Sequence, residues 1–214
     1  MKKLAILGLA MVLVMGLAAY AGAVPYSFDR ITDNGNADVG AQLSVDVTAS
    51  GAGVLFTFYN IGSIASSITD IYFDDGTLLA LSSITDSGAG VAFDTPATPG
   101  NLPGANLASP PFVTTAGFSA DSDNPVMANG VNNTSDGSEW VAIFFTLQGG
   151  KSFADTIAAL NNGDLRIGLH VQAIGTTGGS DSYVNGPPVP EPSTFLLLGA
   201  GLVGVGLLRR KFKK

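Results

Sequence analysis

Two closely spaced aspartates, Asp121 and Asp123, are the residues of this chain best suited to bind a metal ion. They begin the run Asp121-Ser122-Asp123-Asn124, in which alternate oxygen ligands could converge on a hard cation such as calcium. The run is not an EF-hand, because it lacks the glycine that should follow and has Asn132 at the twelfth position. It therefore predicts either a calcium site or two aspartates in turns and on the surface; otherwise no cofactor is expected.

The residues needed for catalysis are scarce. His170 is the single histidine and there is no cysteine, so a Ser-His-Asp set would have to use His170 and a zinc site has too few ligands. Some carboxylate pair is almost inevitable among so many aspartates, which makes a glycosidase pair weak evidence. We therefore expect no catalytic residues and a protein that is not an enzyme, with a hydrolase as the least favoured alternative.

The central part of the chain is strongly acidic. Residues 24–188 contain three cationic side chains (Arg30, Lys151 and Arg166) and sixteen acidic ones, which gives a net charge of −13, whereas the whole chain has −7. Binding to phosphates needs lysine and arginine, so nucleic acid is excluded as a partner. With no cysteine, stability must come from packing, hydrogen bonds and, if the site exists, a cation.

Alternation of apolar and polar residues predicts several β-strands that would position these side chains. The expected strands cover residues 43–48, 53–60, 67–74, 78–81, 139–147 and 165–174. Residues 78–81 are expected to pair back onto the preceding strand across the turn Asp74-Asp75-Gly76. In the last strand, the pattern places Leu165, Ile167, Leu169, Val171 and Ala173 inward and His170 on the opposite face.

One helix and one long loop complete the predicted domain. Ser152 can cap a helix that Asn161-Asn162-Gly163 ends, and five prolines make residues 94–111 a surface loop. Many short strands with glycine-rich turns predict an all-β fold, a two-sheet antiparallel β-sandwich with jelly-roll or Greek-key connections and one short helix. This domain should cover residues 24–188.

The first 23 residues have the pattern of a secretory signal peptide. Lys2 and Lys3 precede the uncharged, largely apolar stretch Leu4–Leu17, and small residues follow. Cleavage by signal peptidase is expected after Ala23, with Ala21 as the alternative position. The apolar stretch should form an N-terminal signal helix that the mature protein lacks.

The last 26 residues combine three features in a fixed order. Val189-Pro190-Glu191-Pro192 precedes the uncharged run Phe195–Leu208, and five arginines and lysines follow that run. A helix of 14 residues spans about 21 Å, which is short for a bilayer core of about 30 Å. The pattern therefore predicts a short transmembrane helix that holds the protein in the membrane transiently, with its basic end in the cytoplasm.

This tail resembles the PEP-CTERM sorting signal of exported bacterial proteins. The resemblance rests on Pro190-Glu191-Pro192, the glycine-rich span Gly199–Gly206 and the basic end. It implies that residues 189–214 are a sorting signal handled by an exosortase in a Gram-negative bacterium that makes extracellular polysaccharide. Interior segments such as residues 67–76 and 165–172 are also similar to segments that recur in PEP-CTERM proteins, and that similarity implies no activity.

The expected function follows from the predicted signal peptide and sorting signal. We expect a non-enzymatic protein at the cell surface or in the extracellular matrix, associated with exopolysaccharide or biofilm. The alternative is a carbohydrate-binding or adhesive module in which exposed aromatic residues, Tyr72, Trp140 or Tyr183, stack on sugars.

Overall fold

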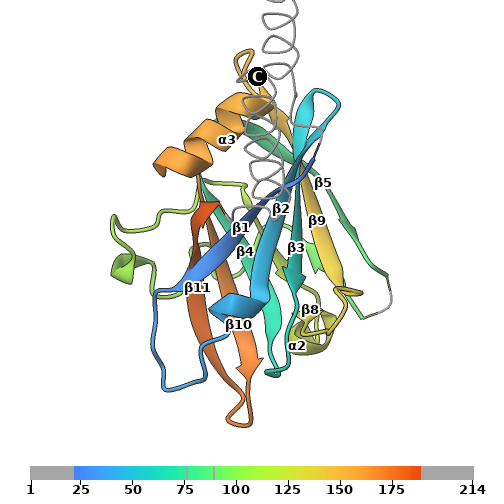
Figure 1. The fold of residues 1–214 in the computed structure, drawn as a ribbon, viewed down its shortest axis with the longest axis vertical. Coiled ribbons are helices and arrows are strands. Elements are labelled where there is room, and N and C mark those ends of the chain that lie inside the picture. The colour runs from blue at the N-terminus through green and yellow to red at the C-terminus, as the bar shows by residue number, and fades with distance from the viewer. Residues whose placement is uncertain (1–21, 76, 89, 189–214) are drawn as a thin grey trace, which may run out of the picture.

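The computed structural model describes residues 22–75, 77–88 and 90–188 (Figure 1). The strands are β1 (Val24–Arg30), β2 (Leu43–Ser50), β3 (Gly53–Asn60), β4 (Ser67–Asp74), β5 (Leu78–Asp86), β6 (Phe93–Asp94), β7 (Ser119–Ser122), β8 (Val131–Asn132), β9 (Trp140–Leu147), β10 (Arg166–Ile174) and β11 (Gly179–Pro188). The helices are α2 (Val126–Asn129) and α3 (Phe153–Asn162), with 3-10 turns η1 (Gly40–Gln42) and η2 (Ala105–Leu107). No helix in this part of the chain is long and apolar enough to cross a membrane.

The strands form one antiparallel sheet in the order β5-β9-β3-β2-β1-β11-β10-β4-β7-β6, with β8 paired to β4. The prediction of a β-rich fold is therefore confirmed. The expected division into two separate sheets is not found among the described strands, because β1, β11 and β10 join the two halves by continuous pairing. The two expected terminal helices lie outside the described residues.

The sheet curls until it is nearly closed around its core. Four strands lie between β3 and β4, so these two would be about 24 Å apart in a flat sheet with strands about 4.8 Å apart. Instead, the ring centroids of Phe56 in β3 and Phe73 in β4 are 5.1 Å apart, and those of Phe73 and Phe145 in β9 are 4.7 Å apart. The curled sheet thus brings residues of its two halves into direct contact.

The six predicted strands are confirmed as β2, β3, β4, β5, β9 and β10, and β3 and β4 have the expected bounds. Strands β1, β6, β7, β8 and β11 were not predicted. The predicted pairing of residues 78–81 is wrong, because β5 pairs with β9 at the edge of the sheet and not with β4. The predicted alternation also fails at the end of β10, where Ala173 is partly exposed and Ile174 is buried. A bulge opposite β11 and a positive φ of 54° at Ala173 reverse the alternation there.

Helix α3 lies across one end of the sheet (Figure 1) and begins and ends as predicted. Ser152 and Asp155 form a capping box, and Gly163 ends the helix in the left-handed conformation. The hydrogen bonds from Ser152 lower the pKa of the Asp155 carboxyl. The prediction of a single helix is wrong, because the short helix α2 follows Pro125. Its one turn has no apolar periodicity that the sequence could reveal.

The proline-rich segment 94–111 was predicted to be a surface loop, but several of its side chains are buried. Leu102, Ala105 and Ala108 pack with Phe112 and Tyr72 into a second, smaller core on the outer face of β4. Gly168 in β10 makes room for this segment, since a Cβ atom there would lie 2.8 Å from Leu102 and 3.1 Å from Phe112. Residues 94–111 therefore cover the outer face of the sheet, and their apolar side chains are buried against it. We call this segment the cover.

Phe145 is fully buried and contacts Phe56, Phe73 and Phe118 edge-on. We expect Phe145→Ala to lower the free energy of unfolding by about 3–5 kcal/mol, because it removes apolar contacts and leaves a cavity. Urea unfolding of residues 24–188 measures this loss. Val113→Ala is the control, since Val113 is 63% exposed and should change stability by no more than about 0.5 kcal/mol. Equal stability of the two variants would contradict this assignment of the core.

Candidate functional site

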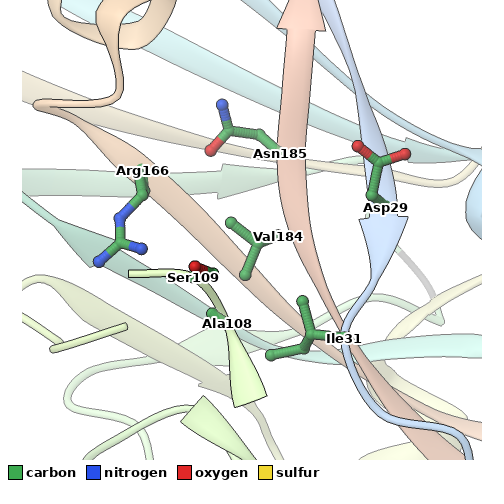
Figure 2. Close-up of a pocket in the computed structure, with 7 residues that line it drawn as sticks. All are labelled: Asp29, Ile31, Ala108, Ser109, Arg166, Val184 and Asn185. Carbon is green, nitrogen blue, oxygen red and sulfur yellow. The ribbon is translucent and has the colours of Figure 1, made fainter. Parts of the chain in front are cut away.

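A hollow of about 210 Å³ lies on the outer face of the sheet, where β1, β10 and β11 run side by side (Figure 2). The lining combines one carboxylate, one guanidinium, one amide and one hydroxyl with three apolar side chains. These residues are Asp29, Ile31, Ala108, Ser109, Arg166, Val184 and Asn185. Residues from both ends of the domain and from the proline-rich cover thus meet at one place.

Arg166 is held rigidly at the edge of this hollow. Its Nη2 donates to the Asp74 carboxylate and to the Pro111 carbonyl at 2.8 Å, and its Nη1 donates to the Pro110 carbonyl at 2.5 Å. The guanidinium also lies over the Phe112 ring, 5.3 Å from its centroid. Asp74 compensates the charge of Arg166, so the hollow offers positioned N–H donors and not an unpaired positive charge.

Asn185 and Asp29 have complementary hydrogen-bonding groups. The Asn185 Oδ1 accepts from the Ile167 backbone N–H at 2.7 Å, and its Nδ2 donates to the Gly186 carbonyl at 3.4 Å, so one N–H of the amide remains as a donor. Asp29 is exposed, and within the described residues its carboxylate has no hydrogen bond or ion pair. The hollow can therefore donate to one hydroxyl group and accept from another.

A second hollow, of about 310 Å³, shares Arg166 and Asn185 with the first. It lies between the end of α3 and the end of β11. Its other lining residues are Leu160, Asn161, Asn162, Gly163, Gly186 and Pro187. The two hollows together make a polar depression on both sides of the Arg166 and Asn185 side chains.

The aspartates predicted to bind calcium lie elsewhere, at β7. Asp121 is opposite Asp70 of β4 and Asp94 of β6, and its Oδ2 accepts from the Thr98 N–H at 3.0 Å. Burial, and to a lesser degree the charge of Asp70, raises the pKa of Asp121. Asp123 is exposed on the segment after β7. In the described part of the chain, no three His, Cys, Asp or Glu side chains form a metal-binding group.

His170 lies on the outer face, as predicted. Its Nδ1 is 2.9 Å from Oδ2 of Asp70, the residue opposite it on β4. The neighbouring Tyr72 donates to the Pro99 carbonyl at 3.0 Å, which fastens the proline-rich cover to the sheet. Burial raises the pKa of Tyr72. This group therefore connects β10, β4 and the cover.

The expectation that exposed aromatic residues would stack on sugars is wrong for both tyrosines. Tyr72 and Tyr183 are fully buried, and Trp140 is partly buried in β9. The Tyr183 hydroxyl accepts from the Val39 N–H at 3.3 Å. Burial raises the pKa of the Tyr183 hydroxyl to about 12. Tyr72 is buried in the second core beneath the proline-rich segment, whereas Tyr183 pairs with Leu169 and belongs to the main core.

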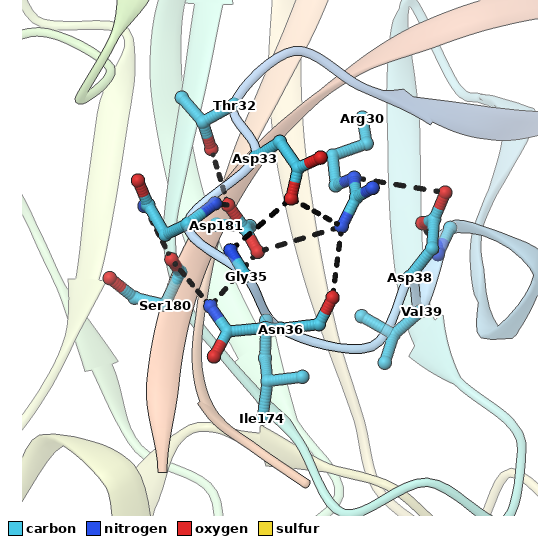
Figure 3. Close-up of polar contacts among 12 residues, drawn as sticks. Arg30, Thr32, Asp33, Gly35, Asn36, Asp38, Val39, Ile174, Ser180 and Asp181 are labelled. Carbon is cyan, nitrogen blue, oxygen red and sulfur yellow. Dashed lines mark hydrogen bonds and ion pairs between the residues drawn. The ribbon is translucent and has the colours of Figure 1, made fainter. Parts of the chain in front are cut away.

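The most extensive polar network surrounds Asp181, which the sequence did not single out (Figure 3). The buried Asp181 carboxylate accepts from Thr32 Oγ1 at 2.9 Å, from the Asn34 N–H at 3.0 Å and from Asn36 Nδ2 at 3.0 Å. Arg30 lies 4.0 Å from Asp181 and also pairs with Asp33 and Asp38. The network fastens the loop after β1 to β11. Its partners are more than 140 residues apart, so no local pattern could reveal it.

The last strand leads directly into the remaining candidate site. Residues 188–211 match the PEP-CTERM protein-sorting motif. The chain carries a PEP-CTERM sorting motif. This motif indicates an exported protein that an exosortase sorts and that is anchored at the cell envelope or surface. No curated protein and no solved structure matches the chain.

The PEP-CTERM motif begins at Pro188, the last residue of β11. Val189, Pro190, Glu191 and Pro192 follow within the matched range but lie outside the described residues. At the other end of the domain, Ala23, the expected signal-peptidase position, directly precedes β1, and Ala21 lies outside the described residues.

Calcium binding at Asp121 and Asp123 remains a prediction that thermal unfolding can test. A bound ion should stabilise the native state by about 2.7 kcal/mol at a hundredfold excess over Kd. The melting temperature should then be higher in millimolar Ca²⁺ than in Na⁺ at equal ionic strength, and Asp121→Asn with Asp123→Asn should remove the difference. Because metal ligands must be deprotonated, the effect should weaken as the pH falls towards the raised pKa of Asp121. Equal melting temperatures in the two salts would contradict the calcium site and leave Asp121 and Asp123 as turn and surface residues.

Proposed function

We propose that this protein is a non-enzymatic component of the bacterial cell surface or extracellular matrix, associated with exopolysaccharide or biofilm. The observation that carries the proposal is the PEP-CTERM motif directly after a folded β-domain. Signal peptidase removes residues 1–23, and the exosortase processes the tail that follows residue 188. The domain between them is the part that functions outside the inner membrane of a Gram-negative cell.

The charge distribution supports a matrix role. Two of the three cationic side chains in residues 24–188, Arg30 and Arg166, are paired with aspartates. The remaining acidic side chains give the domain a negative surface, which disfavours contact with nucleic acid and with other acidic proteins. Such a domain stays dispersed in a hydrated matrix and can contact uncharged polymers.

A second candidate function is that of a carbohydrate-binding module. It is favoured by the hollow of Figure 2, where Asp29 can accept and Asn185 can donate hydrogen bonds beside apolar Ile31 and Val184. Neighbouring hydroxyl groups of a sugar need such a donor and acceptor pair, and the C–H face of the sugar ring needs an apolar surface. The Asp29 carboxylate and the net charge favour a neutral sugar over an acidic one.

Removal of residues 190–214 tests the proposed sorting. The truncated protein should be released as a soluble protein into the periplasm or the medium, because it lacks the sorting motif, while the full chain reaches the cell surface. Cell fractionation and mass spectrometry of the surface-located form measure this. Recovery of residues 195–214 as an intact part of the mature surface protein would contradict processing.

Glycan-array binding of residues 24–188 tests the second candidate. We expect binding of neutral glycans, and at least a tenfold loss of affinity in Asp29→Asn, because the amide replaces an acceptor oxygen by a donor. Asp136→Asn is the matched control, since it removes an exposed carboxylate that does not line the hollow. Equal binding by both variants, or no binding by the parent domain, would reject this hollow as a sugar site.

A further inference from the structure

The position of the sorting motif creates a problem of access. The motif starts at Pro188, and Pro188 is paired with Tyr26 of β1. Strand β11 lies inside the sheet, between β1 and β10 (Figure 1). A peptide that is hydrogen-bonded within a sheet does not enter the active site of a processing enzyme until it detaches. The matched range therefore begins within the last described strand.

The last three residues of β11 lie beside one paired strand, whereas the middle of β11 pairs with strands on both sides. Pairing with β10 ends at Val184, so among the described strands β1 alone pairs with this end of β11, and the end of α3 faces Gly186 and Pro187 across the second hollow. The register with β1 also shifts between Phe28, which pairs with Asn185, and Tyr26, which pairs with Pro188. Prolines have no N–H, so among these three residues Gly186 alone can donate a backbone hydrogen bond.

The residues just before this point are firmly fixed. Tyr183 is fully buried, and the side chain of Asn185 accepts from the Ile167 N–H at 2.7 Å. On the other side of the boundary, Pro187 is exposed, and the 310 Å³ hollow beside Gly186 and Pro187 leaves space around the chain. The contacts that fix β11 to β10 therefore end at Asn185, whose Nδ2 also donates to the Gly186 carbonyl at 3.4 Å.

We propose that Gly186–Pro188 is a detachable spacer, which separates from β1 so that the exosortase can bind the sorting motif while the domain stays folded up to Asn185. Separation breaks the pairing with β1 and the hydrogen bonds of one N–H and three carbonyls, including the one that the Gly186 carbonyl accepts from Asn185 Nδ2. The three freed residues extend the reach of the motif by about 9 Å, since proline-rich chain advances about 3.1 Å per residue. The inference rests on sorting by exosortase, as proposed above.

A variant that strengthens the end of β11 tests this proposal. Pro187→Val with Pro188→Thr restores two N–H donors and two β-favouring residues, so the full-length chain should be processed several-fold more slowly in cells that express the exosortase. Pulse labelling follows the conversion of the precursor to the processed form. Pro103→Val is the matched control in the cover segment, and it should leave the rate unchanged.

A second set of variants distinguishes blocked access of the exosortase to the sorting motif from impaired recognition of the motif sequence. Four inserted residues, Gly-Ser-Gly-Ser, between residues 188 and 189 of the double variant should restore the rate although both prolines remain replaced. Pro187→Val alone, which leaves the matched motif intact, should slow processing to a smaller degree and replaces the double variant if that fails to fold. A normal rate in the proline variants, or a slow rate that the insertion does not restore, would overturn the proposal. Normal surface location after deletion of residues 190–214 would instead refute the sorting on which it rests.

Discussion

The contact of Phe73 with Phe56, Phe58 and Phe145 is the interaction on which the rest of the fold depends. These rings belong to strands that are far apart in the order of the sheet, yet their centroids lie 4.7–6.2 Å apart. Such contacts form only if the sheet curls back upon itself and excludes water from its concave face. Once it has curled, β4 and β10 present their outer face to the proline-rich segment, and the second core can form there.

Buried polar groups then fasten the segments that the apolar core does not reach. Gln42, Asn60 and Ser66 are buried together, and the Gln42 Oε1 accepts from the Ile64 N–H at 2.7 Å while Asn60 Nδ2 donates to the Ser66 carbonyl at 3.0 Å. Asp181 likewise fastens the loop after β1, because its carboxylate accepts from Thr32 Oγ1 and from the Asn34 N–H. Buried polar groups are costly unless they are paired, so these networks specify one arrangement of the connecting loops.

The same architecture relates the two ends of the domain. Strands β1 and β11 are neighbours, so the segment that follows the expected signal peptide and the segment that precedes the sorting motif belong to one part of the sheet. The polar depression around Arg166 and Asn185 borders that part. The lining of this depression comes from both ends of the domain, so the depression could not be recognised from any single segment.

The sequence by itself determined six of the eleven described strands, the ends of helix α3, the acidic character of the domain and the sorting motif, because each depends on neighbours a few residues apart. The short apolar runs bounded by turn residues were sufficient for β3 and β4, and Ser152 with Gly163 was sufficient for the ends of α3. Only the tertiary structure decided that β5 pairs with β9, that Tyr72 and Tyr183 are buried, and that Asp29, Arg166 and Asn185 line one hollow. Those outcomes depend on which strands become neighbours when the sheet curls, and that choice is made by contacts between residues far apart in the chain.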